Sequence, residues 1–305
     1  YYTVTTDSNG ELTADLTEGM YKAVEVQAPD KYDISEPYYF GIGTSREGKM
    51  GYKATWAQGI GGIGSDYIYS AAESSDGGYI VGGYFYGSSI DLGNGIILTN
   101  KGSYDGMVIK YDAEGEAEWA KEIGGEDEDD IRSVARCSDG GYIVGGYFYS
   151  SSIDLGNGIS LTNKGSYDGM VIKYSQDGEV EWAKGIGGTH FDYINSVAEC
   201  NDGGYIVGGY FYSNSIDLGN GISLTKKGSE DGMVIKYSQD GEVEWAKGIG
   251  GTGSDYINSV AECNDGGYIV GGNFESSSID LGNGISLTNK GHPDGMVIKY
   301  SQDGE

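Results

Sequence analysis

The most acidic stretch of the chain, residues 126–130, is the first place where side chains could do chemistry. It holds five consecutive carboxylates, and an aspartate recurs at the matching positions Asp66, Asp129, Asp192 and Asp255. Carboxylate oxygens are the ligands that Ca²⁺ prefers. No copy contains the D-x-[DN]-x-[DN]-G calcium loop, so a solvated acidic loop is the favoured interpretation. Asp129 and Asp130 stay as calcium candidates, and no other cofactor is expected.

Three residues in front of the recurring aspartate differ from copy to copy. A loop that varies on a constant scaffold is where recognition can be tuned, although neutral drift on a solvated loop is the simpler explanation. The four versions are Ile63-Gly64-Ser65, Glu126-Asp127-Glu128, Thr189-His190-Phe191 and Thr252-Gly253-Ser254. The ligand-binding candidates are therefore Glu126, Asp127, Glu128, His190 and Phe191.

Motifs for catalysis are missing from the sequence. There is no G-x-S-x-G, no P-loop and no His/Cys cluster, and His190 and His292 lie in variable loops without a partner motif. An active site is usually one asymmetric group of residues, whereas this chain offers near-identical copies. We therefore expect no enzymatic activity.

The three cysteines, Cys137, Cys200 and Cys263, are each 63 residues apart, and Ser74 fills the fourth matching position. Matching positions of neighbouring repeats do not generally bring Cα atoms within the roughly 7 Å that a disulfide needs. Buried free thiols are expected.

The amino-acid composition argues against some classes of binding partner. The chain has 305 residues with 47 Asp+Glu against 19 Lys+Arg, a formal net charge of −28. This balance argues against nucleic-acid and anionic-membrane partners, which are held by clustered Lys and Arg. With 56 Gly, 27 Tyr and only 3 Pro, the sequence suits many short strands joined by tight turns.

The same 63-residue interval relates all four tryptophans, Trp56, Trp119, Trp182 and Trp245. It also relates four copies of GGYIVGG or a near variant, four of IDLGNG and four of DGMVIKY. Because near-identical copies recur at one fixed interval, the repeat is the main basis for predicting the fold. Within the third copy, residues 195–200, 205–212, 232–237 and 242–249 are expected to be strands, with Asp-Gly turns after the first and third.

Four antiparallel strands per unit are typical of a β-propeller blade, and a β-solenoid is the alternative. Each unit exceeds a typical blade by a long insertion loop between its second and third strands, residues 213–229 in the third copy. The IDLGNG segments, with Asp91, Asp154, Asp217 and Asp280, are expected to form hairpin tips. The insertion and the variable loop before the recurring aspartate should share one face, here called the long-loop face. Residues 55–60 either complete the last blade and close a four-bladed ring, or more blades exist.

The string DGMVIKYSQDGEVEWAKGIGG followed by DYINSVAECNDGGYIVGG resembles the bacterial β-propeller repeat of large secreted and surface proteins, over residues 54–305. That resemblance implies an extracellular setting. The repeats, with units beginning near 56, 119, 182 and 245, stop in mid-pattern and are expected to be incomplete at the C-terminus.

Residues 1–45 contain LTEGMYKAVEVQAPDKYDISEPYYFGI, which resembles the second half of a prealbumin-like β-sandwich of the SpaA or Cna-B type from Gram-positive surface proteins. Residues 46–53 would be a linker. The resemblance implies that Glu25 could be the acid that assists an isopeptide crosslink, but no acceptor Asn occurs between Asn9 and Asn94. An ordinary strand residue is favoured.

Together these features predict a non-enzymatic adhesin of the bacterial cell surface or cell wall. It would bind a host or environmental glycan, or an extracellular protein, through the long-loop face, and the full-length protein would be attached to the wall without inserting into the membrane. A passive spacer is the alternative, and a glycan-active propeller enzyme, which would need paired acids in one pocket, is a weaker one.

Overall fold

The computed structural model describes residues 19–23, 38–42 and 54–305, and in these ranges it contains strands and no helix. The chain divides into two units, residues 1–57 and 58–305. In the first, β1 (Gly19–Ala23) pairs with β2 (Tyr38–Ile42) in antiparallel register, with Gly19 opposite Ile42. Glu25 and the expected linker 46–53 lie outside the described residues.

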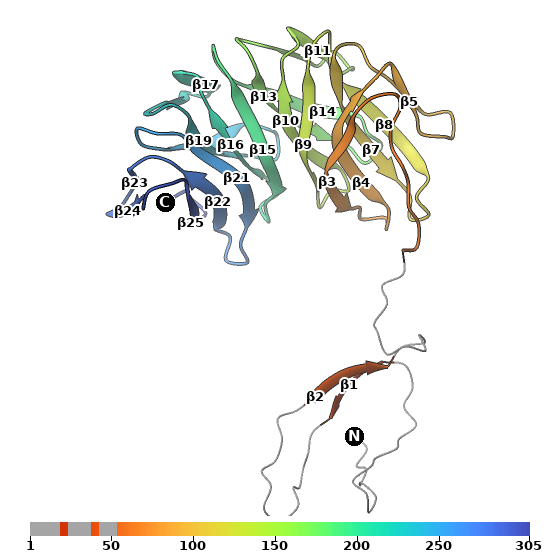
Figure 1. Ribbon diagram of the computed structural model, residues 1–305, viewed down its shortest axis with the longest axis horizontal. Helices are drawn as coiled ribbons and strands as arrows, with labels where there is room; N and C mark the ends of the chain where they lie inside the picture. Colours follow the sequence, from red (N-terminus) through yellow and green to blue (C-terminus); the bar gives the residue numbers. More distant parts are fainter. Residues whose placement is uncertain (1–18, 24–37, 43–53) are drawn as a thin grey trace, which may run out of the picture. The chain divides into compact units, whose positions relative to one another are not determined.

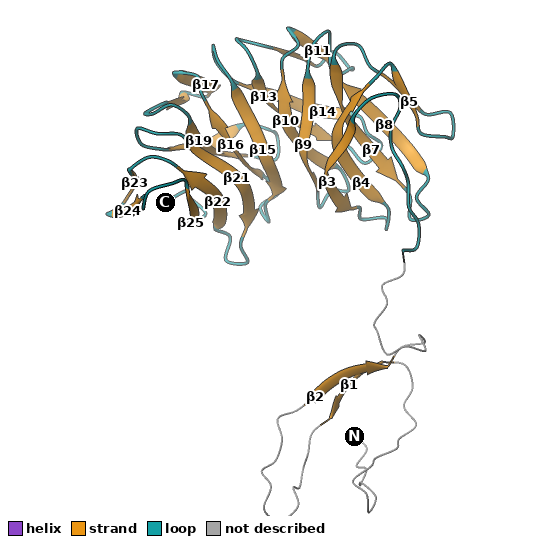
Figure 2. Ribbon diagram, viewed as in Figure 1, coloured by secondary structure: helices purple, strands orange, loops and turns teal. Residues whose placement is uncertain are grey.

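Each repeat of the second unit folds as an antiparallel sheet with a small hairpin inserted after its second strand (Figure 2). The first sheet contains β3 (Asp66–Glu73), β4 (Tyr79–Tyr86), β7 (Tyr104–Tyr111) and β8 (Ala117–Ile123), with hairpin β5 (Ser89–Asp91) and β6 (Ile97–Thr99). The second contains β9 (Asp129–Arg136), β10 (Tyr142–Phe148), β13 (Asp168–Tyr174) and β14 (Val180–Ile186), with hairpin β11 (Ser152–Asp154) and β12 (Ser160–Thr162).

The third and fourth repeats continue the pattern. The third sheet contains β15 (Asp192–Glu199), β16 (Tyr205–Phe211), β19 (Asp231–Tyr237) and β20 (Val243–Ile249), with hairpin β17 (Ser215–Gly219) and β18 (Ile222–Thr225). The fourth has three strands, β21 (Asp255–Glu262), β22 (Tyr268–Phe274) and β25 (Asp294–Tyr300), with hairpin β23 (Ser278–Gly282) and β24 (Ile285–Thr288). The prediction of an all-β chain of four propeller-blade repeats is confirmed.

The insertion is thus a hairpin and not an irregular loop. Its tip needs backbone conformations that few residues adopt: in the second repeat Gly156, Asn157 and Gly158 have φ values of 83°, 53° and 78°. Gly and Asn tolerate this left-handed region best. Asp154 Oδ1 accepts a hydrogen bond of 2.9 Å from Gly156 N, so the aspartate of IDLGNG has a structural role at the tip.

The four blades follow one another along an arc (Figure 1). The first strands β3, β9, β15 and β21 lie on its concave side, and the small hairpins lie toward its convex edge. Residues 54–60 form no strand, and the fourth sheet ends at β25. Closure of a four-bladed ring by residues 55–60 is therefore not what this structure shows.

Neighbouring blades pack through aliphatic side chains seated on glycines. Ile194 and Val197 on β15 are buried, and they face Gly145 on β10 of the preceding blade. A Cβ placed on Gly145 would lie 2.6 Å from Val197 Cγ1 and 2.9 Å from Ile194 Cγ2. The GGYIVGG segment therefore keeps glycine where the next blade approaches its backbone.

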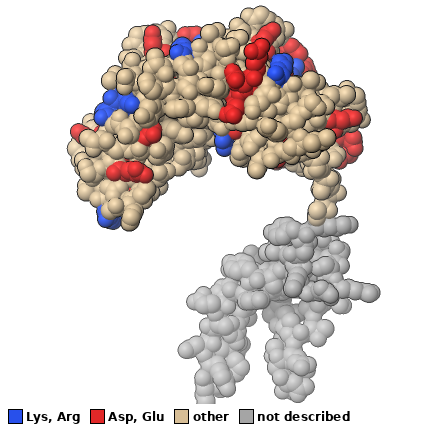
Figure 3. All heavy atoms as spheres, turned by 45° about the horizontal axis from the view of Figure 1, so that its top comes forward, with Lys and Arg blue, Asp and Glu red and all other residues tan. Residues whose placement is uncertain are grey.

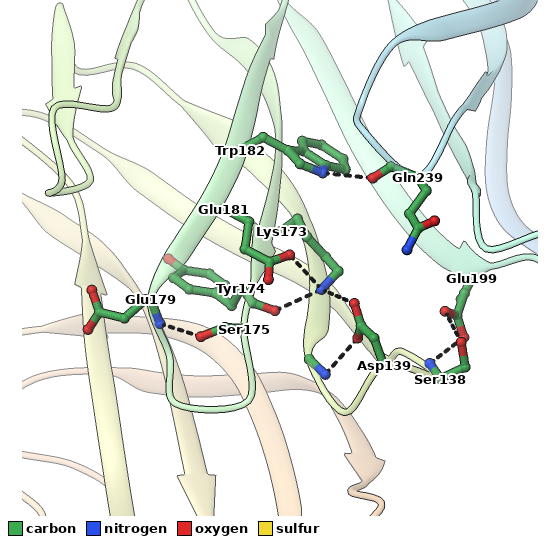
Figure 4. A network of polar contacts seen from close by, with 11 residues as sticks. Ser138, Asp139, Lys173, Tyr174, Ser175, Glu179, Glu181, Trp182, Glu199 and Gln239 are labelled. Carbon is green, nitrogen blue, oxygen red and sulfur yellow. Dashed lines mark hydrogen bonds and ion pairs between the residues drawn. The ribbon is translucent and has the colours of Figure 1, made fainter.

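In each of the first three blades a buried lysine joins the strands at the short-turn face, the face opposite the long loops, as Figure 4 shows for the second blade. The Lys173 side chain is 1% exposed, and its ammonium lies 2.9 Å from Asp139 Oδ2 and 3.0 Å from Glu181 Oε2. It also donates to the Tyr174 carbonyl oxygen at 3.1 Å. Lys110 and Lys236 repeat this arrangement with Asp76 and Asp202.

Tryptophan and cysteine complete the junctions. Trp119 Nε1 donates to the Gln176 carbonyl oxygen of the next blade at 3.1 Å, and Trp182 does the same to Gln239. All three cysteines are free, with Cys137 and Cys200 buried and Cys263 half-buried. The expectation of unpaired thiols is confirmed, and Cys263 is the one of the three that is not fully buried.

Candidate ligand-binding surface

The recurring aspartate holds each variable loop in place. Asp192 is fully buried, and its Oδ2 accepts hydrogen bonds from Gly188 N at 2.9 Å and Ser213 Oγ at 2.6 Å. Its Oδ1 accepts from the amides of Tyr212 and Ser213 at 3.2 and 3.1 Å. The loop 188–191 is thereby tied to the end of strand β16 of the same blade.

Asp129 makes the same set of bonds in the second blade, to Gly125, Tyr149 and Ser150. Both Asp129 and Asp130 are buried, so the interpretation of 126–130 as a solvated loop holds for Glu126 and Asp127 and is wrong for these two residues. Protein donors bond to both oxygens of Asp129. Within the described residues no three acidic, His or Cys side chains gather as a metal-binding group.

A second buried carboxylate ties the insertion to the blade. Asp168 Oδ2 accepts a hydrogen bond of 2.8 Å from Lys164 N, and Asp231 Oδ2 accepts one of 2.7 Å from Lys227 N. Burial, and to a smaller extent the nearby charge of Asp192, raise the pKa of Asp168 to about 6, an effect that the hydrogen bond from Lys164 N partly opposes. In the second and third blades one buried carboxylate thus holds the variable loop and another holds the insertion, which makes the long-loop face rigid.

The second blade differs from the others in its first strand, where Asp130 and Arg132 replace the Tyr and Asn of the third and fourth copies. Arg132 donates to Tyr147 Oη at 2.8 Å and lies 3.0 Å from Asp130 Oδ2. Its guanidinium carbon is 4.2 Å from the centroid of the Tyr69 ring. Burial raises the pKa of Asp130 to about 7, an effect that Arg132 and then Tyr147 oppose.

Glu128 is half-buried and joins two blades. Its Oε2 accepts a hydrogen bond of 3.3 Å from the hydroxyl of Tyr104 in the first blade and another from the hydroxyl of Tyr167 in the second. Burial raises the pKa of both phenols well above the usual value of a tyrosine, and the Glu128 charge adds to this effect. Glu128 therefore positions aromatic rings and does not project freely into solvent.

Tyr167 is the centre of a band of rings on the long-loop face. Tyr149, Phe191 and Tyr193 stack on it with centroid distances of 4.8, 5.7 and 5.7 Å. Tyr149 and Phe191 remain 42% and 43% exposed. Rings that are fixed by their neighbours and still exposed can stack on a ligand at little cost in conformational entropy.

A shallow pocket of about 420 Å³ lies beside Tyr149. Its lining combines one aromatic ring with a carboxylate, an ammonium, a hydroxyl and an amide: Asp127, Tyr149, Ser151, Asn163, Lys164 and Gly165. An apolar ring next to several hydrogen-bonding groups suits a ligand that has both an apolar face and hydroxyls.

His190 occupies the position of Asp127 in the next blade. Its Nδ1 lies 2.9 Å from Thr189 Oγ1, its amide donates to Ser213 Oγ at 3.0 Å, and its ring is 5.4 Å from that of Tyr212. The structure thus places Asp127, His190 and Phe191 on one face, with Glu126 exposed at its edge. Sequence reasoning did not single out Tyr149, Tyr167, Lys164 or Lys226. Substitutions between repeats, such as Glu275 for Tyr149, would have pointed to Tyr149, Tyr167 and Lys226, whereas Lys164 is a lysine in all four copies and carries no such signal.

Comparison with known proteins agrees with the two-part organisation. Residues 1–55 match the SpaA family, described as a prealbumin-like fold domain. The chain therefore starts with prealbumin-like sequence and continues as β-propeller repeats.

The repeats are similar to two curated proteins. One is an uncharacterized WD repeat-containing protein of Acanthamoeba polyphaga mimivirus, 28% identical over 153 residues, which are 47% of this chain and 11% of that protein. The other is the regulatory protein FlaEY of Caulobacter vibrioides, 27% identical over 143 residues, 46% of this chain and 15% of that protein. The chain spans only a small part of either relative.

Among solved structures, the WD40 domain of Neurospora crassa Pan2 aligns with 78% of this chain and 63% of its own at 12% identity and a TM-score of 0.32. A Bacteroides caccae protein of unknown function aligns with 69% of this chain and 74% of its own at 12% identity and a TM-score of 0.22. In the part of the chain that the structure describes, no helix is long and apolar enough to cross a membrane.

Proposed function

We propose that the propeller is a non-enzymatic ligand-binding module of a secreted or wall-attached bacterial surface protein, with the prealbumin-like domain as its stalk. The ligand would be an extracellular glycan, or an extracellular protein as the alternative, bound through the long-loop face. The match of residues 1–55 to a prealbumin-like domain supports this location, because the segment resembles domains of Gram-positive surface proteins.

One observation carries the binding proposal: exposed rings stand on loops that buried carboxylates hold rigid. Tyr149 is stacked on Tyr167 and still open to solvent next to the pocket that contains Asp127 and Lys164. A pyranose ring has an apolar face for Tyr149 and hydroxyls for the charged groups. Similar sites in successive blades, acting together, would bind more tightly than any single site, an effect known as avidity.

A binding experiment with matched variants tests this proposal. The 305-residue chain would be applied to an array of immobilised neutral and acidic polysaccharides, and the affinity for an oligosaccharide of the best one measured by calorimetry. Tyr149→Ala should weaken binding about tenfold, because loss of a stacked ring costs on the order of 1 kcal/mol. Glu114→Ala, an exposed change in the turn between β7 and β8 on the short-turn face, should leave binding unchanged.

Binding to no polysaccharide on the array would contradict the glycan ligand. If the chain also does not bind extracellular matrix proteins, it would be better described as a passive spacer. Equal losses for Tyr149→Ala and Glu114→Ala would move the binding site away from the long-loop face.

A further inference from the structure

The third blade carries a basic cluster on a chain that is otherwise strongly acidic. Where the other three repeats have Asn100, Asn163 and Asn289, it has Lys226, and Lys227 follows. His190 stands where the other repeats have Gly64, Asp127 and Gly253. On the face drawn in Figure 3, the Lys and Arg side chains form small separate groups beside more extensive acidic ones.

Tyr212 holds the ammonium of Lys226 in position. Lys226 Nζ donates to the Tyr212 carbonyl oxygen at 2.6 Å and lies 4.1 Å from the centroid of the Tyr212 ring. An ammonium has three donors, so two remain for a ligand. In the second blade the matching Asn163 instead uses its amide nitrogen to bond the Phe148 and Ser166 carbonyl oxygens. The lysine therefore adds a charge that the scaffold does not need.

The backbone around the cluster is fixed. Asp231 accepts hydrogen bonds from Lys227 N at 2.7 Å and Gly228 N at 3.2 Å, and Ser213 Oγ accepts one from His190 N at 3.0 Å. Asp231 and Asp192 are buried beneath the loops: the two amides occupy Asp231, and Ser213 Oγ donates to Asp192 Oδ2. Glu230 accepts a hydrogen bond from Ser254 Oγ. The nearest carboxylates thus have partners within the protein.

An aromatic platform borders the cluster. The exposed ring of Phe191 lies 6.2 Å from that of Tyr212, and it follows His190 in the same loop. His190 Nδ1 is engaged with Thr189, so the ligand-facing hydrogen bond of this imidazole would come from Nε2. An ammonium, an imidazole and an apolar ring thus surround the Tyr212 ring, and together they match a pyranose that bears a carboxylate.

We infer that the third blade contains a subsite for an acidic sugar, with the pyranose on Phe191 and its carboxylate bound by Lys226, Lys227 and His190. This inference rests on the proposed glycan binding and names the ligand class for one blade. The second blade, with Asp127 in place of His190 and Asn163 in place of Lys226, would take a neutral sugar. The repeats therefore differ in specificity on a common scaffold.

The test uses two ligands that differ only at the carboxylate. Trigalacturonate and its fully methyl-esterified, neutral form would be titrated into the 305-residue chain by calorimetry at pH 6 and low salt. The acid should bind about tenfold tighter than the ester, and added salt should remove much of this difference, since salt screens exposed charges. Lys226→Asn installs the residue of the other three blades, so it should fold normally and abolish the preference for the acid.

The second blade provides the converse variant. Asp127→His combined with Asn163→Lys should create a second acid-preferring site and leave the third blade unchanged. Binding of the ester that persists in Lys226→Asn would show that the loss is specific to the carboxylate.

The outcomes separate this inference from the proposed function. If acid and ester bind equally, or if Lys226→Asn keeps the preference, the acidic-sugar subsite is wrong while glycan binding stands. If an oligoglutamate peptide of the same charge binds as tightly as trigalacturonate, the ligand class is an acidic peptide and not a sugar. If neither sugar binds although neutral polysaccharides do, this subsite fails alone, and if no polysaccharide binds, both proposals fail.

Discussion

At the scale of single residues, this chain uses buried carboxylates as scaffolding. Asp129 and Asp192 have no solvent exposure, and each organises a loop through several donors. Burial raises the pKa of both, because desolvation disfavours the charged form. Hydrogen bonds to the charged form oppose this effect. Asp130 differs from Asp129 and Asp192, since its Oδ1 is buried without a partner, as are the Oδ1 atoms of Asp105 and Asp168.

Asp130 should make stability depend on pH. Its pKa rises from 3.8 to about 7 in the folded chain, so between these values the folded state keeps a proton that the unfolded state has lost. Stability from this residue is therefore greatest below pH ~4 and declines as the pH rises to about 7. Asp130→Asn removes the titration, so its stability relative to the natural chain should increase from pH 4.5 to pH 7.5 by about 3 kcal/mol, since each pH unit up to about 7 contributes about 1.4 kcal/mol.

Urea unfolding of both chains at the two pH values measures this difference. Asp127→Asn, at an exposed position three residues away, serves as the control. A difference between Asp130→Asn and the natural chain that does not change with pH would show that Asp130 is already ionised at pH 4.5.

At the scale of secondary-structure elements, glycine in the second strand of each blade sets how closely the blades approach. Gly145 on β10 leaves room for Ile194 and Val197 of β15, and both of these side chains are buried. The matching Gly271 on β22 has no atom within 4 Å of a Cβ built on it. Packing of the next blade thus requires a glycine at Gly145, whereas there is room for a larger side chain at Gly271.

Gly145→Ala should destabilise the propeller by about 1–3 kcal/mol, because the added methyl group overpacks the junction between the second and third blades. Gly271→Ala should be neutral or slightly stabilising, since alanine suits a strand better than glycine. Thermal unfolding of the two variants measures both effects. Equal melting temperatures would refute the view that β15 packs directly on this glycine.

At the scale of the whole propeller unit, stability should be uneven along the arc. In a repeat protein each unit is stabilised mainly by its neighbours. The fourth blade has three strands: Val297 is 71% exposed, whereas its counterparts Val171 and Val234 are fully buried. The Lys299 side chain is 44% exposed against 1% for Lys173.

Amide hydrogen exchange of the 305-residue chain should therefore be fastest in β21, β22 and β25 among the blade strands and slowest in the second and third blades. Mass spectrometry of peptides from each repeat gives the comparison, with the near-identical strands β13, β19 and β25 as internal references. Uniform protection across these three strands would indicate a fully cooperative unit.

The repeat, the strand order of a blade and the positions of its turns could be predicted from the amino-acid sequence alone. These depend on local patterns, such as the 63-residue period, alternation in DGMVIKY and glycines at turns, which act through short-range sterics. The sequence also indicated the variable loops, and with them Asp127, His190 and Phe191.

Which side chains of these loops stay exposed depends on how the blade packs. Asp129 and Asp130 closely follow Asp127 in sequence but are buried. Donors from Tyr149 and Ser150, just after β10, bond Asp129, and the hydroxyl of Tyr147 on β10 bonds Asp130. The pairing of Lys226 with the Tyr212 ring and of Glu128 with tyrosines from two blades likewise depends on contacts across the fold. Burial and long-range contacts are properties of packing, which a single local pattern does not contain.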